Sequence, residues 1–193
     1  GLIIHTENGG NSWISQGSST TNILYDIFFT DTTHGWIVGW DGTILYTDDG
    51  GDNWTPQSSG TTSRLYGVTF ANDNTGWVAG RWGTVLKTTN SGEEWTTQET
   101  GSTMRLLAVD FVDTETGWVV GMDGFILNTS DGGDHWQNQN LSAGPWLNAV
   151  DFIDDSTGWA VATRASIFNT VNGGQNWKGQ EHHPQAFTPV HFT

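Results

Sequence analysis

An eight-residue motif occurs five times in the chain, and each copy lies 41 residues after the one before. The copies are TENGGNSW (6–13), TDDGGDNW (47–54), TTNSGEEW (88–95), TSDGGDHW (129–136) and TVNGGQNW (170–177). A fixed period of roughly 20 to 50 residues marks a repeat protein, in which each period is one small supersecondary unit. A feature that is present five times is expected to belong to the scaffold rather than to a single catalytic centre.

Each period contains four short segments with the composition of β-strands. In the unit 106–146 they are 106–111, 117–121, 124–129 and 136–140. Each is about four to six residues long and is bounded by Gly, Asp, Asn or Ser, as in the strands of a meander. A helical repeat would show a 3.6-residue apolar periodicity, which is not present here. The sequence therefore predicts an all-β fold, a β-propeller whose 41-residue blades have four strands each.

The two ends of the chain suggest how the ring closes. Four complete units cover 24–64, 65–105, 106–146 and 147–186, and residues 1–23 contain only the third and fourth strands of a unit. Phe187, Val190 and Phe192 match the pattern of a first strand. We expect one domain, 1–193, with five blades, one of them split between 187–193 and 1–23 and lacking its second strand. The alternative is a fragment of a seven-bladed propeller. Such a fragment would have open sheet edges, with which a second copy of the chain could pair.

The charge and composition exclude several classes of partner. The chain has 6 basic and 21 acidic residues, a net charge of −15, so a nucleic acid is not expected to bind. No apolar run is long enough to insert into a membrane. The absence of cysteine excludes a disulfide framework and a thiolate metal site. The chain begins with Gly1 rather than Met, which is consistent with removal of a leader, and we expect an extracytoplasmic protein, secreted or periplasmic.

The repeated motif has the chemistry of a tight turn. An Asp or Asn side chain accepts hydrogen bonds from its own turn, a glycine supplies a conformation that a Cβ would hinder, and the tryptophan packs beneath. Three of the five acceptors are Asn, a weak ligand for a hard cation, so we expect no metal and no cofactor. The structural residues are Asn8, Trp13, Asp49, Trp54, Asn90, Trp95, Asp131, Trp136, Asn172 and Trp177.

This motif, T-x-[D/N]-x-G-x-x-W, resembles the Asp-box, or bacterial neuraminidase repeat, which forms the turn between the third and fourth strands of a blade. The longer unit, L-x-x-V-x-F…T-G-W-x-V-G-x-x-G-x-I-L-x-T-x-D-G-G-x-x-W, is similar to the repeats of the photosystem II stability and assembly factor family. Members of that family have seven blades and an arginine patch that engages a membrane-protein partner. The resemblance implies a scaffold that binds a protein, in the thylakoid lumen if the source is photosynthetic.

Sialidases also carry Asp-boxes, so catalysis has to be considered. Their chemistry needs three arginines on the substrate carboxylate and a Tyr–Glu nucleophile pair, and here no Glu accompanies Tyr25 or Tyr66 in the repeat pattern. No G-x-S-x-G motif occurs either. We assign no catalytic residue; if the protein were an enzyme, the expected class would be a glycoside hydrolase.

The positions that differ between blades are the candidates for binding. They lie in the turn between the second and third strands and just before the first strand, which a propeller places together at the mouth of its channel. Trp and Arg predominate among them, and these residue types are enriched in binding hot spots. The predicted ligand-binding residues are Trp40, Arg64, Arg81, Trp82, Arg105, Met122, Trp146 and Arg164. We expect a protein partner there, with a glycan as the alternative; these side chains could also simply fill the channel.

Overall fold

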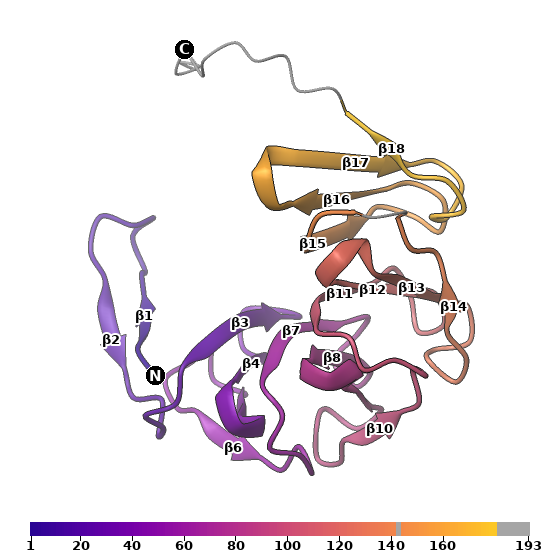
Figure 1. Ribbon diagram of the computed structural model, residues 1–193. Coiled ribbons are helices and arrows are strands. Elements are labelled where there is room, and N and C mark those ends of the chain that lie inside the picture. Colours follow the sequence, from indigo (N-terminus) through magenta and orange to yellow (C-terminus); the bar gives the residue numbers. More distant parts are fainter. Residues whose placement is uncertain (142–143, 181–193) are drawn as a thin grey trace.

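The computed structural model describes residues 1–141 and 144–180. Within them the chain forms four antiparallel four-stranded sheets and one two-stranded hairpin, with no helix other than short 3-10 turns. The sheets follow one another around an arc, with the hairpin at one end and the last sheet at the other (Figure 1). The predicted all-β fold of repeated four-stranded blades is confirmed.

The strands of each sheet follow in chain order from the inner edge of the arc outward. Blade 1 has β3 (Leu24–Phe29), β4 (Gly35–Gly39), β5 (Ile44–Thr47) and β6 (Thr55–Gln57). Blade 2 has β7 (Leu65–Phe70), β8 (Gly76–Gly80), β9 (Val85–Thr88) and β10 (Thr96–Gln98). Blade 3 has β11 (Leu106–Phe111), β12 (Gly117–Gly121), β13 (Ile126–Thr129) and β14 (Gln137–Asn138). Blade 4 has β15 (Leu147–Phe152), β16 (Gly158–Ala162), β17 (Ser166–Thr170) and β18 (Lys178–Gly179).

The first strand of every blade carries a bulge at the same place. In blade 1 the register shifts between Leu24 and Asp26, which leaves Tyr25 without a partner on β4. The equivalent shift in blade 2 leaves out Tyr66. A bulge bends its strand and re-aims the extra side chain. The repeat therefore presents one variable side chain per blade at the start of the inner strand.

A 3-10 turn joins the second and third strands of each blade. The turns are η1 (Trp40–Gly42), η2 (Arg81–Gly83), η3 (Met122–Gly124) and η4 (Thr163–Ala165). The middle residue of each has a positive φ, between 53° and 64°. The residues in that position are Asp41, Trp82, Asp123 and Arg164. Asp tolerates this left-handed conformation, whereas Trp and Arg adopt it at a cost.

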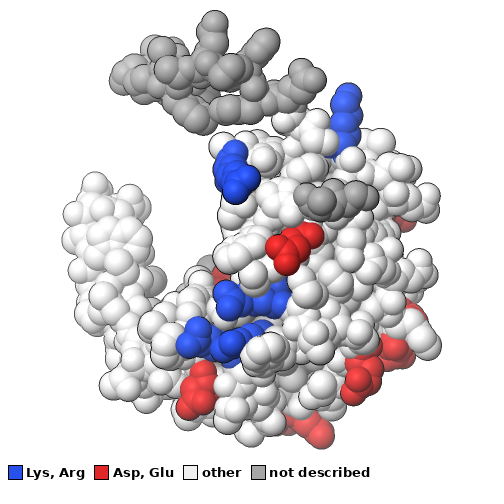
Figure 2. Space-filling view, in the orientation of Figure 1, with Lys and Arg blue, Asp and Glu red and all other residues white. Residues whose placement is uncertain are grey.

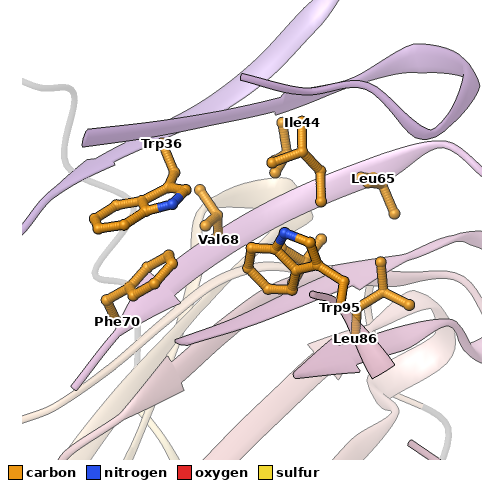
Figure 3. Close-up of a cluster of buried hydrophobic side chains, with 9 residues drawn as sticks. Trp36, Ile44, Leu65, Val68, Phe70, Leu86 and Trp95 are labelled. Carbon is orange, nitrogen blue, oxygen red and sulfur yellow. The ribbon is translucent and has the colours of Figure 1, made fainter. Parts of the chain in front are cut away.

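The blades are held together by tryptophans of the second strand. Trp36, Trp77 and Trp118 are fully buried, and each indole stacks on a phenylalanine of the next blade. The centroids of Trp118 and Phe152 are 3.4 Å apart with 3° between the ring planes, and the Trp118 Nε1–H donates to the Gly173 carbonyl 3.2 Å away. Figure 3 shows the first of these seams, where Trp36 and Phe70 lie against each other beside Trp95.

The N-terminal hairpin is β1 (Ile3–His5) and β2 (Ile14–Gln16). Its Trp13 is 57% exposed, unlike the expectation that each motif tryptophan packs under its turn. In blades 1 to 4 a phenylalanine of the first strand meets the motif tryptophan edge-on, and in the described part of the chain the hairpin has no such strand. The expected completion of this blade by 187–193 falls outside the described residues, so the five-bladed count stays a prediction.

Candidate functional site

The Asp-box turns use their polar side chains internally. In the second copy, the Asp49 carboxylate accepts hydrogen bonds from the Thr47 hydroxyl at 2.8 Å and the Asn53 backbone N–H at 2.9 Å. The Thr47 hydroxyl oxygen also accepts the Gly51 N–H at 2.9 Å. The Thr–Asx–Gly pattern recurs in the other copies, whether the Asx residue is Asp or Asn. These residues are therefore occupied in closing the turn.

The same hydrogen bonds set the pKa values of the motif aspartates. Donation from the Asn53 side chain and backbone lowers the pKa of Asp49 to about 2. Donation from the His135 backbone and ring lowers the pKa of Asp131 to about 2 as well. Across residues 1–141 and 144–180, no group of three or more His, Asp or Glu side chains could hold a metal ion.

Two buried carboxylates also belong to the scaffold. Asp26 and Asp110 have pKa values raised by burial, a property often found at catalytic sites. However, Asp26 accepts the Val68 N–H at 2.9 Å, and Asp110 accepts the Phe152 N–H at 2.6 Å, each from the inner strand of the following blade. They therefore join neighbouring blades.

The predicted binding positions are brought together within each blade by backbone hydrogen bonds. The N–H of Arg81 donates to the Arg64 carbonyl at 2.8 Å, and the N–H of Met122 donates to the Arg105 carbonyl at 3.1 Å. A Cβ on Gly121 would lie 2.1 Å from that Arg105 carbonyl, so only glycine permits this approach. The turn after the second strand and the start of the first strand thus share one edge of the blade.

Side chains from blades 1, 2 and 3 form a continuous series along this edge, which we call the arginine–aromatic ridge: Tyr25, Trp40, Arg64, Tyr66 and Arg105. The Arg64 guanidinium lies 4.0 Å from the Trp40 ring centroid, and the Trp40 indole N–H donates to the Tyr25 hydroxyl. Tyr25 and Tyr66 have ring centroids 5.0 Å apart, and Arg105 lies 5.7 Å from the Tyr66 centroid. Cation–π contacts hold both guanidinium groups while leaving their edges free to donate.

The arginines have no acidic partners in the described part of the chain. None of Arg64, Arg81, Arg105 and Arg164 forms a salt bridge or a side-chain hydrogen bond within residues 1–141 and 144–180, although the protein has 21 acidic residues. In Figure 2 several blue side chains gather along the inner edge of the arc, while much of the red lies toward its outer rim. Because a guanidinium group without a carboxylate keeps its donors available, this edge can bind an anion.

A pocket of about 250 Å³ lies between blades 2 and 3, and we call it the methionine pocket. Its lining includes Arg81, Trp82, Met104, Arg105, Met122 and Asp123. The Arg81 guanidinium lies 4.4 Å from the Trp82 ring centroid, and the Trp82 side chain is 62% exposed. Trp82 takes its left-handed φ of 64° at this position. Strain of this kind in a bulky residue is typical of functional sites.

The remaining predicted residues lie one blade further along. Trp146 and Arg164 line a larger pocket of about 660 Å³ between blades 3 and 4, together with Asp123 and Pro145. These residues occupy the repeat positions of the methionine pocket, shifted by one blade. The eight predicted residues thus fall into the ridge and two successive pockets. Arg105 belongs to both the ridge and the methionine pocket, and Asp123, which was not predicted, lines both pockets.

Sequence reasoning did not include Tyr25, Tyr66 or Met104 among the site residues. The two tyrosines were visible as a variable position, but their role depends on the bulge, which the apolar pattern does not reveal. Met104 carried one usable signal, because the chain has only two methionines and both line the same pocket.

A comparison with protein families gives one match. A family model described as Photosynthesis system II assembly factor YCF48 matches residues 5–102 and 93–149. None of the curated proteins compared with the chain matches it. No helix in the described residues is both long and apolar enough to cross a membrane.

Solved structures share the fold. A structure described as "YCF48 bound to D1 peptide" has a TM-score of 0.70 at 24% identity. The match covers 85% of this chain and 55% of the chain in that structure. YCF48 from Cyanidioschyzon merolae has a TM-score of 0.67 at 24% identity, covering 83% and 56%. A GH74 enzyme from Niastella koreensis has a TM-score of 0.73 at 15% identity, covering 91% and 33%. The chain thus spans little more than half the length of the YCF48 structures it matches, and at these identities the likeness shows the fold alone.

Proposed function

Because the chain belongs to the photosynthesis system II assembly factor YCF48 family, we propose that it is a non-catalytic binding propeller whose ligand is an acidic, extended segment of a protein partner. A relative of the same fold is known as a complex with a D1 peptide, which supports a peptide as the ligand here. An extracytoplasmic location is part of this proposal, the thylakoid lumen in a photosynthetic source.

The observation that carries the proposal is the set of arginines that have no acidic partner among residues 1–141 and 144–180. In a protein with a net charge of −15, guanidinium groups would be expected to pair with nearby carboxylates. Arg64, Arg81 and Arg105 instead lie over aromatic rings at one edge of the blades. Arginine binds carboxylates in a planar, bidentate manner, so acidic side chains or a peptide carboxyl group are the ligands that fit.

The shape of the ridge favours an extended ligand. It runs from Trp40 on blade 1 through Tyr66 on blade 2 to Arg105 on blade 3, and it is a surface rather than a closed cavity. Its side chains are all at least partly exposed. Aromatic and arginine side chains in such a row are typical of protein interfaces, where these residue types supply most of the binding energy. A glycan could also stack on these rings, and the experiment distinguishes the two ligands.

The test is a titration of short peptides that together span the D1 sequence, with binding measured by calorimetry. At least one acidic peptide should bind, and Arg64→Gln or Arg105→Gln should each weaken it by about tenfold, the loss of one charge-assisted contact. Lys178→Gln is the matched control, because it removes one exposed positive charge on the outer strand of blade 4 and should leave affinity unchanged.

Two results would contradict the proposal. If no peptide binds while the circular dichroism spectrum is native, the protein-partner assignment is wrong. If a glycan array gives saturable binding that Trp82→Asn abolishes, the ligand is a sugar. Asn suits the left-handed conformation of that position, so this variant is expected to fold.

A further inference from the structure

The methionine pocket is distinct from the ridge in shape and chemistry. Both methionines of the chain line it, Met104 from the segment before β11 and Met122 from η3. Trp82 forms an exposed wall. The thioether side chain of methionine is flexible and polarizable, so two of them adapt to an apolar group of variable shape.

The size of the pocket limits what it can hold. Its volume of about 250 Å³ is below the range of roughly 300 to 1,000 Å³ found for pockets that enclose whole drug-sized ligands. It is large enough for one aliphatic side chain. The stems of Arg81 and Arg105 add apolar surface to the lining, as arginine stems do when their charged ends remain in water.

The charges around the pocket favour an anionic group at its rim. Arg81 and Arg105 contribute two positive charges and Asp123 one negative charge. Within the described residues neither guanidinium group has a carboxylate partner. A ligand that combines an aliphatic side chain with a nearby carboxylate would therefore satisfy both the interior and the rim.

The next pocket along the arc shows that this chemistry is not a general property of the repeat. At the equivalent positions it has Asp123, Pro145 and Trp146 in place of Trp82, Met104 and Arg105, and its volume is about 660 Å³. The same backbone therefore forms one small methionine-lined pocket and one larger, more polar pocket. This difference makes the second pocket a control within the same molecule.

We propose that the methionine pocket anchors an aliphatic side chain that lies next to a carboxylate, and so selects which segment of a partner binds. This inference rests on the proposed peptide-binding function. It adds to that function a specificity-determining pocket, with Met104 and Met122 contacting the anchor side chain and Arg81 and Arg105 contacting the carboxylate.

The chain offers a direct test, because labelling methionine with ¹³C-methyl groups gives two NMR signals, both from the pocket. The probes are N-acetyl-leucine, N-acetyl-leucinamide and N-acetyl-lysine, and Met122→Leu assigns the signals with little change in volume. Both signals should shift with N-acetyl-leucine, and the amide should bind about tenfold more weakly because it lacks the charge. N-acetyl-lysine should give no saturable shift.

Variants separate the rim from the interior. In Arg81→Gln/Arg105→Gln the acid and the amide should bind equally, whereas Lys178→Gln, on the outer strand of blade 4, should leave the tenfold preference intact. Equal binding of acid and amide in the parent protein, or no movement of either signal, would overturn the inference. If D1 peptides bind without moving the methionine signals, this inference fails and the proposed function stands. If N-acetyl-leucine moves them but no peptide binds, the proposed function fails instead.

Discussion

At the scale of single residues, the acceptor of each Asp-box shows that one role can be filled with or without charge. Asn90 and Asn172 accept the same backbone N–H groups as Asp49 and Asp131 at nearly the same distances. The charge is therefore not needed for the turn, and it makes two of the five turns sensitive to acid. A carboxylate with a lowered pKa favours the folded state only while it is ionised.

We predict that stability falls as the pH decreases from about 4, the ordinary aspartate pKa, toward about 2, to which the turns lower the pKa of Asp49 and Asp131. The double variant Asp49→Asn/Asp131→Asn should lose less of its melting temperature over that range than the parent protein. Thermal unfolding at each pH measures both. Asp26 and Asp110, whose pKa values are raised, change stability with pH in the opposite direction, but they are present in both proteins. Parallel curves of melting temperature against pH for the two proteins would contradict the prediction.

At the scale of the element, the second strand of each blade determines how neighbouring blades pack together. Its tryptophan stacks on the inner-strand phenylalanine of the following blade and donates to a carbonyl in that blade's Asp-box turn. The stacking contact joins residues 34 positions apart and the hydrogen bond joins residues 55 positions apart, one shorter and one longer than the 41-residue period. Each blade is therefore completed by the one after it, as in other repeat arrays.

This seam predicts different costs for the same substitution in two blades. Trp118→Ala should lower the free energy of unfolding by about 3–5 kcal/mol, because its indole is fully buried against Phe152. Trp159, at the same position of blade 4, is only partly buried and has no aromatic partner among the described residues. Trp159→Ala should cost about half as much or less. Denaturant titration compares the two, and equal losses would contradict the seam as the source of stability.

At the scale of the whole molecule, the described residues form an arc whose end units have a neighbour on one side. Blades 2 and 3 are flanked on both sides, and their β8 and β12 are buried along their whole length. The hairpin β1–β2 has two short strands, and its Trp13 is exposed. In such arrays local stability follows the number of interfaces that each unit makes.

Hydrogen exchange should reveal this gradient. We expect amides of β8 and β12 to exchange most slowly and those of β1 and β2 most rapidly, because among the described residues the hairpin has one neighbouring unit and each central blade has two (Figure 1). Exchange measured by mass spectrometry on peptides from each blade gives the comparison. Uniform protection across all units would mean that the array unfolds as one cooperative block.

Much of the fold could be predicted because its rules are local. The Thr–Asx–Gly turn forms among residues within four positions of one another, and the apolar runs that flank it recur in every unit. The spacing of the five motifs then indicates blades in a row. The arginines and tryptophans of the candidate site were also visible, since they interrupt a pattern that the other blades keep.

Which residues of the candidate site contact one another could be found only from the tertiary structure. Tyr25 and Tyr66 meet because a bulge turns each of them out of its strand. Met104 and Met122 line one pocket because the Met122 N–H donates to the Arg105 carbonyl and so joins the turn of blade 3 to the start of its first strand. The sequence by itself determined the repeating unit, because turn and strand chemistry act between near neighbours. Only the packing of one blade on the next decided which variable side chains share a surface, because that depends on contacts between residues tens of positions apart.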